Sequence, residues 1–170
     1  MNVLAVNASP SDTSRTHALA AAAVEVAGSG RVVDLGSLPA DALLGRTTDP
    51  AVDALLEDLR TEALLLLATP VYRATYTGLL KVVFDQLREG DLEGTACVLA
   101  ATAATPAHFL SLDTGMRALV ASLGGWSVPT VVYAVGDDVS KAGPVAPAVD
   151  QRLRRALAEA GSVTGGLPDA

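Results

Sequence analysis

Short apolar runs of strand length recur along the chain, with stretches of helical period between them. Because the apolar positions within each run are continuous rather than alternating, the runs predict strands that are buried on both faces. The Leu-rich run at 64–68 is also compatible with a helix by propensity, but its length and the Thr69-Pro70 pair that ends it favour a strand. The five predicted strands contain residues 3–6, 32–33, 64–68, 97–100 and 131–135.

Apolar residues spaced three and four apart predict helices between these strands. Ser14 or Thr13 is available to cap the first helix, and Asp49 followed by Pro50 is typical of the start of the second. Strand and helix alternate five times, which predicts an α/β fold with a five-stranded parallel sheet and helices on both faces. The predicted helices contain residues 16–27, 50–59, 78–88, 107–123 and 146–160.

The length and ends of the pattern predict one domain. A chain of 170 residues suits a single core. The helical pattern ends at residue 160, so we expect a domain over 1–160 and a mobile, Gly-containing tail over 161–170. Longer loops are predicted at 36–48 and 136–147.

Charge and composition exclude several classes of protein. With 19 acidic against 12 basic residues and a net charge of −7, the chain lacks the clustered cations that nucleic acids or anionic membranes need. Its longest apolar run is far too short to span a bilayer, and its N-terminus lacks the positive region of a signal peptide. Cys97 is the only cysteine, and neither His17 nor His108 has a second ligand at zinc spacing. We therefore expect a cytoplasmic protein without a metal site, nucleic acid or membrane partner.

The predicted sheet draws attention to three loops, at 8–15, 70–77 and 103–107. Ligands of open α/β sheets bind at the carboxyl ends of the strands, where these loops begin. The first loop and the start of its helix place five hydroxyl side chains around Arg15, and helix amides, hydroxyls and a guanidinium together favour a phosphate. An ordinary Ser/Thr-rich turn that caps the helix is the alternative. The loop matches neither a dinucleotide fingerprint nor a Walker A motif.

The second loop contains two of the chain's three tyrosines, Tyr72 and Tyr76. Pro70 restricts the backbone where the chain leaves the sheet, and the two phenol rings offer flat amphipathic surfaces. A planar heteroaromatic ligand would suit this loop. The alternative is that both rings are buried against the loop's own helix.

The second loop also carries a resemblance to a known family. Residues 68–81, Ala-Thr-Pro-Val-Tyr-Arg-Ala-Thr-Tyr-Thr-Gly-Leu-Leu-Lys, resemble the flavin-contacting signature of the NAD(P)H-dependent FMN reductases. The similarity is closest to the branch that feeds reduced FMN to two-component monooxygenases such as those for alkanesulfonates. It extends over about residues 1–160 and implies a flavodoxin-like three-layer sandwich. Supporting matches are Ala8-Ser9-Pro10, Ser14-Arg15-Thr16, Thr105-Pro106-Ala107-His108 and Leu112-Asp113.

The resemblance implies a role for each loop. The FMN phosphate would be held by Ser9, Ser14, Arg15 and Thr16. The isoalloxazine ring would be lined by Pro70, Val71, Tyr72 and Arg73, and its other edge approached by Ala103, Ala104 and Thr105. Hydride passes from nicotinamide to flavin without a protein acid or base, so no catalytic residue and no metal are expected.

The chain departs from the family pattern at each part of this expected site. Ala8 stands where members usually have glycine, and Ser11 where they usually have arginine. Ala103-Ala104 replaces a common Gly-Gly pair. Thr114 replaces a tyrosine that the best-known sulfonate-linked members carry in a π-type bulge.

The expected function is an NAD(P)H:FMN oxidoreductase that supplies reduced flavin to a partner monooxygenase and forms a homodimer or homotetramer. Two alternatives remain open at this point. One is an FMN-bound quinone or azo reductase, and the other is a non-catalytic flavodoxin-like flavin-binding protein.

Overall fold

A computed structural model describes residues 1–11, 13–141 and 144–164. Its strands are β1 (Asn2–Asn7), β2 (Ser29–Asp34), β3 (Leu64–Pro70), β4 (Ala96–Ala103), β5 (Trp126–Ser127) and β6 (Val132–Val135). Its α-helices are α1 (Arg15–Ala27), α2 (Ala40–Leu43), α3 (Pro50–Thr61), α4 (Gly78–Phe84), α5 (Arg117–Ala121) and α6 (Pro147–Thr164). Shorter helical segments are η1 (Leu35–Ser37), η2 (Pro106–His108), η3 (Leu112–Met116) and η4 (Gly136–Asp138).

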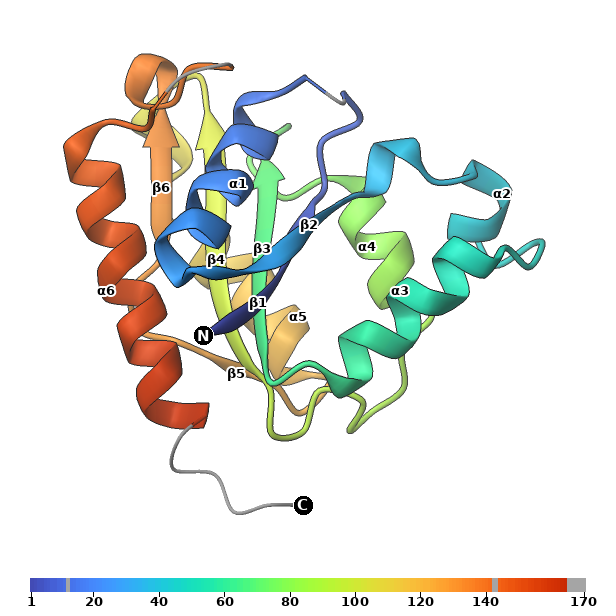
Figure 1. Cartoon of the computed structure of the whole chain (residues 1–170). Coiled ribbons are helices and arrows are strands. Elements are labelled where there is room, and N and C mark those ends of the chain that lie inside the picture. Colours follow the sequence, from blue (N-terminus) through green and yellow to red (C-terminus); the bar gives the residue numbers. More distant parts are fainter. Residues whose placement is uncertain (12, 142–143, 165–170) are drawn as a thin grey trace.

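The sheet is parallel and has the order β2-β1-β3-β4-β5, with β6 also paired to β4. This order confirms the flavodoxin-like fold, in which the chain moves outward from β1 in one direction and then from β3 in the other. The reversal separates the loops that follow β1 and β3 and opens a crevice between them. The carboxyl ends of the strands lie at the upper edge in Figure 1, where the loops after β1, β3 and β4 gather.

The expected count of five strands needs a small correction. β5 and β6 occupy one position in the sheet, because both pair with β4, at Ala96–Cys97 and at residues 100–103 respectively. Pro129 lies between them and has no N–H to donate to the ladder, which accounts for the interruption. The sheet therefore has six strands in five positions.

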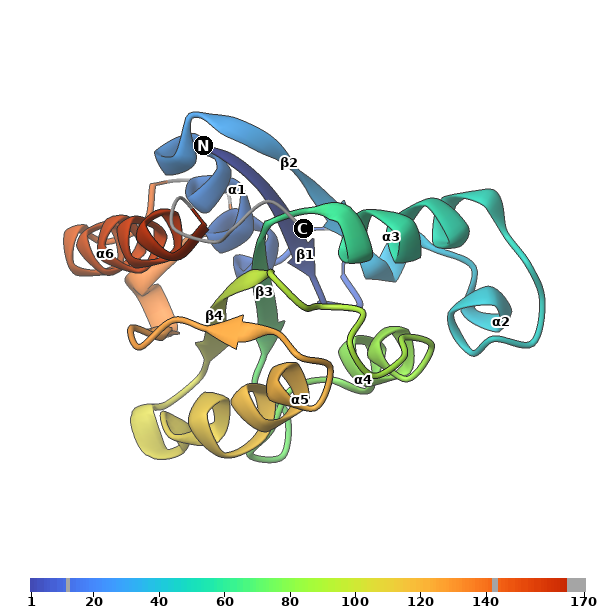
Figure 2. The same cartoon turned by 90° about the horizontal axis from the view of Figure 1, so that it is seen from below.

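Each face of the sheet carries its own core. α1 and α6 pack on one face, and α3, α4 and α5 pack on the other (Figures 1 and 2). Strand residues alternate between the two cores, so Val3 and Ala5 contribute to the α1 side and Leu4 and Val6 to the α3 side. Burial on both faces is the physical reason for the continuous apolar runs.

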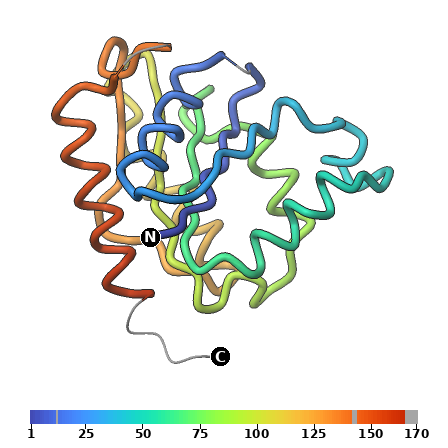
Figure 3. The backbone as a smooth tube through the Cα atoms, in the orientation of Figure 1, coloured from blue at the N-terminus to red at the C-terminus, as the bar shows by residue number. Residues whose placement is uncertain are grey.

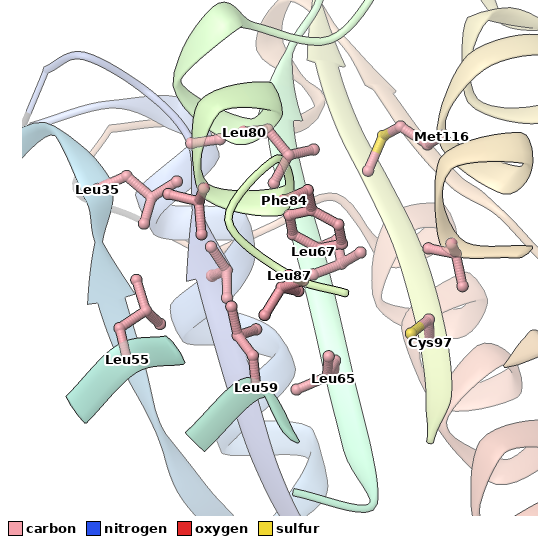
Figure 4. Packing of buried hydrophobic residues seen from close by; sticks show 14 of the residues in the cluster. Leu35, Leu55, Leu59, Leu65, Leu67, Leu80, Phe84, Leu87, Cys97 and Met116 are labelled. Carbon is pink, nitrogen blue, oxygen red and sulfur yellow. The ribbon is translucent and has the colours of Figure 1, made fainter. Parts of the chain in front are cut away.

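Leucine side chains fill most of the core on the α3 side. Figure 4 shows side chains from α3 and α4 converging on β3. The labelled residues of this contact are Leu55, Leu59, Leu65, Leu67, Leu80 and Phe84, all fully buried. This packing fixes the direction in which β3 delivers the second loop to the sheet edge.

Two predicted helix starts are confirmed. Ser14 caps α1, with its Oγ accepting a hydrogen bond from the His17 amide at 3.0 Å. Asp49 caps α3, whose first residue is Pro50, and its Oδ1 accepts from the Ala51 amide at 2.9 Å. Both caps satisfy donors that the helix leaves without partners.

Other element boundaries differ from those expected. The predicted loop at 36–48 contains α2 and the end of η1. β2 begins at Ser29, before the apolar pair that predicted it. The apolar pattern did not include its first residues because they are exposed. α4 ends at Phe84 rather than at residue 88. α6 continues to Thr164, past residue 160, and Gly161 approaches the Met1 side chain closely. The rest of the expected tail, 165–170, lies outside the described residues.

The single helix expected at 107–123 is divided into η2, η3 and α5. η3 is a π-helix over Leu112–Met116 that contains Thr114. The π geometry is therefore present in this chain although threonine replaces the family's tyrosine. Both the amide and the Oγ1 of Thr114 donate to the Leu110 carbonyl, each at 3.0 Å, just before this wider turn.

The backbone path is shown in Figure 3. β1 begins beside the lower part of α1, and the Met1 ammonium donates to the carbonyl of Ala27 at the end of that helix. Within the part of the chain that the structure describes, no helix combines the length and apolar character needed to cross a membrane.

Candidate functional site

A cavity of about 370 Å³ lies at the carboxyl edge of the sheet, among the loops that follow β1, β3 and β4. Nine of the eleven site residues expected from the sequence line it: Ser9, Ser14, Arg15, Thr16, Pro70, Val71, Tyr72, Ala103 and Ala104. The two that do not are Arg73 and Thr105. Ser11, Thr13, Thr102 and Lys141 line it as well.

The first loop is arched by side chains that bond to its own backbone. Ser9 donates its amide to Asn7 Oδ1 at 3.1 Å, and Ser11 donates its amide to Ser9 Oγ at 3.2 Å. Asn7 is fully buried and donates its Nδ2 to Asp34 Oδ1 at 2.7 Å. His17 Nδ1 contacts the same Asp34 oxygen at 2.8 Å. The end of β2 thereby supports the loop from behind.

The N-terminus of α1 is open toward the cavity. The amides of Arg15 and Thr16, at its first two positions, have no acceptor among the described residues, as expected for the first turn of a helix. No acidic residue occupies that turn. Free amides and the positive end of the helix dipole favour an anion at this point.

Two cationic side chains add to this positive end. Arg15 lines the cavity and remains 44% exposed, and its Nη2 lies 3.5 Å from Asp137 Oδ1. Lys141 also lines the cavity and is exposed. Sequence reasoning missed Lys141 because it comes from a distant loop without a recognisable motif.

Hydrogen bonds join the three loops into one unit. Thr16 Oγ1 and Thr102 Oγ1 lie 2.7 Å apart in a buried contact between the start of α1 and the end of β4, next to the first and third loops. Thr77 Oγ1 donates to the Ala8 carbonyl at 2.8 Å and so joins the second loop to the first. The Val71 amide donates to the Thr102 carbonyl at 2.8 Å. Because these groups are paired, the cavity walls are held in position before any ligand arrives.

The second loop forms a tight two-residue turn. Tyr72 and Thr75 exchange backbone hydrogen bonds of 3.0 and 3.2 Å, and the central residues Arg73 and Ala74 have φ of 52° and 66°. Positive φ at both central positions is typical of a type I′ turn, which usually contains glycine or asparagine. Arg73, within the turn, does not line the cavity, whereas Tyr72 lines it and is 54% exposed.

The two tyrosines have different surroundings. Tyr76 packs against the π-helix η3, where a Cβ added to Gly115 would lie 3.1 Å from the Tyr76 ring. The absence of a side chain at Gly115 therefore allows the ring to approach the helix backbone. Only Tyr72 has its ring at the cavity, so the alternative of two rings buried against α4 does not describe this loop.

We expect Ala74→Gly to stabilise the protein by about 0.5–1 kcal/mol, because glycine adopts positive φ without the cost that alanine incurs, less the entropy that glycine loses on folding. Urea unfolding without flavin measures this change. Ala107→Gly is the control, since Ala107 has no positive φ and the substitution there should destabilise. Equal destabilisation by both variants would contradict the strain at Ala74.

The third loop presents small side chains to the cavity and anchors itself outside it. Ala103 and Ala104 line the wall, whereas Thr105 caps η2 through its Oγ1 and accepts a hydrogen bond from the Tyr133 hydroxyl at 3.1 Å on its carbonyl. Burial raises the pKa of Tyr133, so this phenol stays protonated and donating at neutral pH. Thr105 thus holds the loop in place.

Other candidate chemistry is absent from the cavity. Cys97 is fully buried in β4, and burial raises the pKa of its thiol to about 12, so it carries no thiolate at neutral pH. Among the residues that the structure describes, no three His, Cys, Asp or Glu side chains are placed to hold a metal ion. A larger, open groove of about 890 Å³ runs along α1 toward α6, and seven alanine, valine and proline residues line it together with His17, Glu25, Lys141, Asp150 and Arg154.

The chain is similar to known proteins over nearly its whole length. The family described as NADPH-dependent FMN reductase matches residues 1–140. An FMN reductase (NADPH) of Pseudomonas aeruginosa is 35% identical, with 96% of this chain and 92% of the relative covered. The NADH-dependent FMN reductase SfnF of Pseudomonas putida is 32% identical, covering 92% and 89%. A solved apo structure of an NADH:FMN oxidoreductase, EMOB, superposes with a TM-score of 0.83 at 29% identity, covering 99% and 91%.

Proposed function

Because the chain belongs to the NADPH-dependent FMN reductase family, it is an NAD(P)H-dependent oxidoreductase that reduces FMN, and we propose that the cavity at the carboxyl edge of the sheet binds the flavin. We further propose that the reduced flavin leaves and serves a partner monooxygenase. The observation that carries the site is the convergence of Arg15, the free amides of α1 and the Tyr72 loop on one cavity.

The part of the cavity at the N-terminus of α1 fits the FMN phosphate. Arg15 supplies a guanidinium, and the amides of Arg15 and Thr16 supply unpaired donors beside it. Ser9 and Ser14 contribute hydroxyls whose oxygens already accept the amides of Ser11 and His17 respectively, so each still has its own O–H to donate. Thr16 Oγ1 pairs with Thr102, so we assign Thr16 to the phosphate through its amide.

The remaining wall fits the isoalloxazine ring. The lining of this part is largely apolar and consists of Pro70, Val71 and Tyr72 from the second loop and Ala103 and Ala104 from the third. Arg73 and Thr105 lie outside the lining, so we assign them positioning roles: Arg73 through the turn and Thr105 through its contacts with Tyr133 and η2.

The chemistry requires little of the protein beyond position. Bound FMN supplies the ring nitrogen that accepts a hydride from the nicotinamide. Hydrogen bonds between the segments that line the cavity would hold its walls in place around the flavin, and Ala103 and Ala104 would contribute only small side chains to that wall. No side chain needs to donate or accept a proton in the hydride step.

The open cavity supports flavin as a substrate that is exchanged. Arg15 and Lys141 are both exposed, and Tyr72 stands at the rim, so solvent reaches the phosphate end and the ring end. An exchangeable flavin suits delivery to a monooxygenase. The family resemblance supports that partner class, and we also propose a cytoplasmic location.

We propose a homo-oligomer, in which the exposed apolar side chains beside the third loop are covered. Phe109 and Leu110 are 56% and 53% exposed and follow η2 directly. Large apolar groups in sequence at a surface favour burial against another chain. Light scattering of the purified protein gives the mass that tests this assembly.

The function is tested by following NAD(P)H oxidation at 340 nm with and without added FMN. We expect a rate that depends on FMN with at least one of the two nucleotides. The relatives carry both NADPH and NADH in their names, so both are assayed. FMN binding without nucleotide oxidation would instead favour a flavodoxin-like carrier. Protein that is purified with FMN bound and reduces quinones by ping-pong kinetics would favour a quinone reductase.

A further inference from the structure

Arg15, which we propose as the phosphate ligand, already has an anionic neighbour in this chain. Its Nη2 lies 3.5 Å from Asp137 Oδ1. Asp137 belongs to η4, the turn that follows β6, and the last residue of β6, Val135, pairs with Ala103 of the third loop. The sheet register therefore brings this acidic turn to the same edge as the phosphate end of the cavity.

The two aspartates of this turn have different surroundings. Asp138 Oδ2 accepts a hydrogen bond from the Val135 amide at 2.8 Å, and the Asp138 carbonyl accepts one from the Ala146 amide at 2.7 Å. These bonds hold the turn in place. The Asp137 side chain is fully exposed, and its one ion-pair partner among the described residues is Arg15. Asp137 is therefore not needed to form the turn.

A phosphate and Asp137 both require the guanidinium of Arg15. The first turn of α1 contains no acidic side chain, and Asp137, although it does not itself line the cavity, is the carboxylate that pairs with Arg15 within the described residues. A phosphate carries up to two negative charges and would lie beside this carboxylate. Binding therefore loses the Arg15–Asp137 attraction and adds repulsion between two anions.

We propose that Asp137 competes with the FMN phosphate for Arg15 and so weakens the hold on FMN, which favours release of the flavin. This inference rests on the proposed phosphate site. By lowering the affinity for FMN, Asp137 would favour a flavin that is exchanged over one that is retained. Riboflavin, which has no phosphate, is not subject to the competition.

The test measures the dissociation constants of FMN and riboflavin by flavin fluorescence for wild-type protein and for Asp137→Asn. We expect Asp137→Asn to bind FMN about three- to tenfold more tightly, because an exposed ion pair and a nearby like charge are both removed. Riboflavin affinity should stay the same. The gain should shrink in high salt, which screens exposed charges, and FMN should dissociate more slowly in stopped-flow displacement.

Two matched variants isolate the position of the charge. Asp53→Asn removes the same charge from an exposed site on α3 without an ion pair among the described residues, and should change FMN affinity by less than about 1.5-fold. Asp137→Glu keeps the carboxylate and should bind FMN as wild type does. Unchanged or weaker FMN binding by Asp137→Asn would overturn the competition. Wild-type protein that prefers riboflavin or binds both flavins equally would overturn the phosphate site, and the competition with it.

Discussion

Replacing Arg15 with alanine is expected to weaken FMN binding by about 1.5–3 kcal/mol, which is roughly 10- to 150-fold in the dissociation constant. The Arg15 guanidinium supplies a charged donor at the phosphate end of the cavity, and Arg15 is also the first residue of α1. Its removal leaves the phosphate with helix amides, hydroxyls and the exposed Lys141. Riboflavin affinity should change little, because riboflavin lacks the group that Arg15 binds.

Fluorescence titration with both flavins measures this selectivity. Arg46→Ala removes one positive charge from an exposed loop away from the cavity lining and is the matched control. Combining Arg15→Ala with Asp137→Asn should recover part of the lost FMN affinity, since the remaining carboxylate no longer repels the phosphate. Equal losses for FMN and riboflavin would show that Arg15 does not bind the phosphate.

The second large effect is expected at the buried pair Thr16 and Thr102. Replacing either one with valine leaves the other hydroxyl without its partner at 2.7 Å, in a place where water has little access. We expect each single variant to lower the free energy of unfolding by about 1–3 kcal/mol. The double valine variant should be destabilised by less than the sum of the two, because it leaves no orphaned hydroxyl.

Urea unfolding of the four proteins gives the coupling between the two residues. Thr47→Val, at an exposed position, is the control and should change stability by less than about 0.5 kcal/mol. Additive effects in the double variant would mean that the two hydroxyls do not depend on each other. FMN affinity in the single variants reports on the site, since the pair joins the start of α1 to the third loop.

The fold was predictable because its signals are local. Burial on both faces makes strand residues apolar without alternation, and helix ends need partners for their free amides. Both requirements act within a few residues, so the segment 64–68 predicted β3, Asp49 marked the start of α3, and Ser14 or Thr13 marked the start of α1, where the structure has Ser14. The α/β alternation then placed the expected loops at one sheet edge, and nine of their eleven expected residues line one cavity.

Element boundaries were less predictable where tertiary contacts override local pattern. The helix expected at 107–123 contains the π-helix η3, whose Gly115 lets Tyr76 approach the backbone. Nothing near Gly115 in the sequence specifies that contact. The fifth strand expected at 131–135 is β6, whereas the two-residue β5 before Pro129 was not expected, because only its pairing with β4 defines it as a strand.

The sequence by itself determined the order of strands and helices along the chain, the helix caps, and the positions of the hydroxyl-rich and aromatic loops. Each of these depends on residues that are close together in the sequence. Only the tertiary structure decided which distant groups meet there: Thr102 beside Thr16, Lys141 at the cavity wall and Asp137 beside Arg15. These contacts depend on the register of the sheet, in particular on the pairing of β6 with β4, which positions the turn that follows β6. Register is a property of paired strands, and no single segment of sequence specifies it.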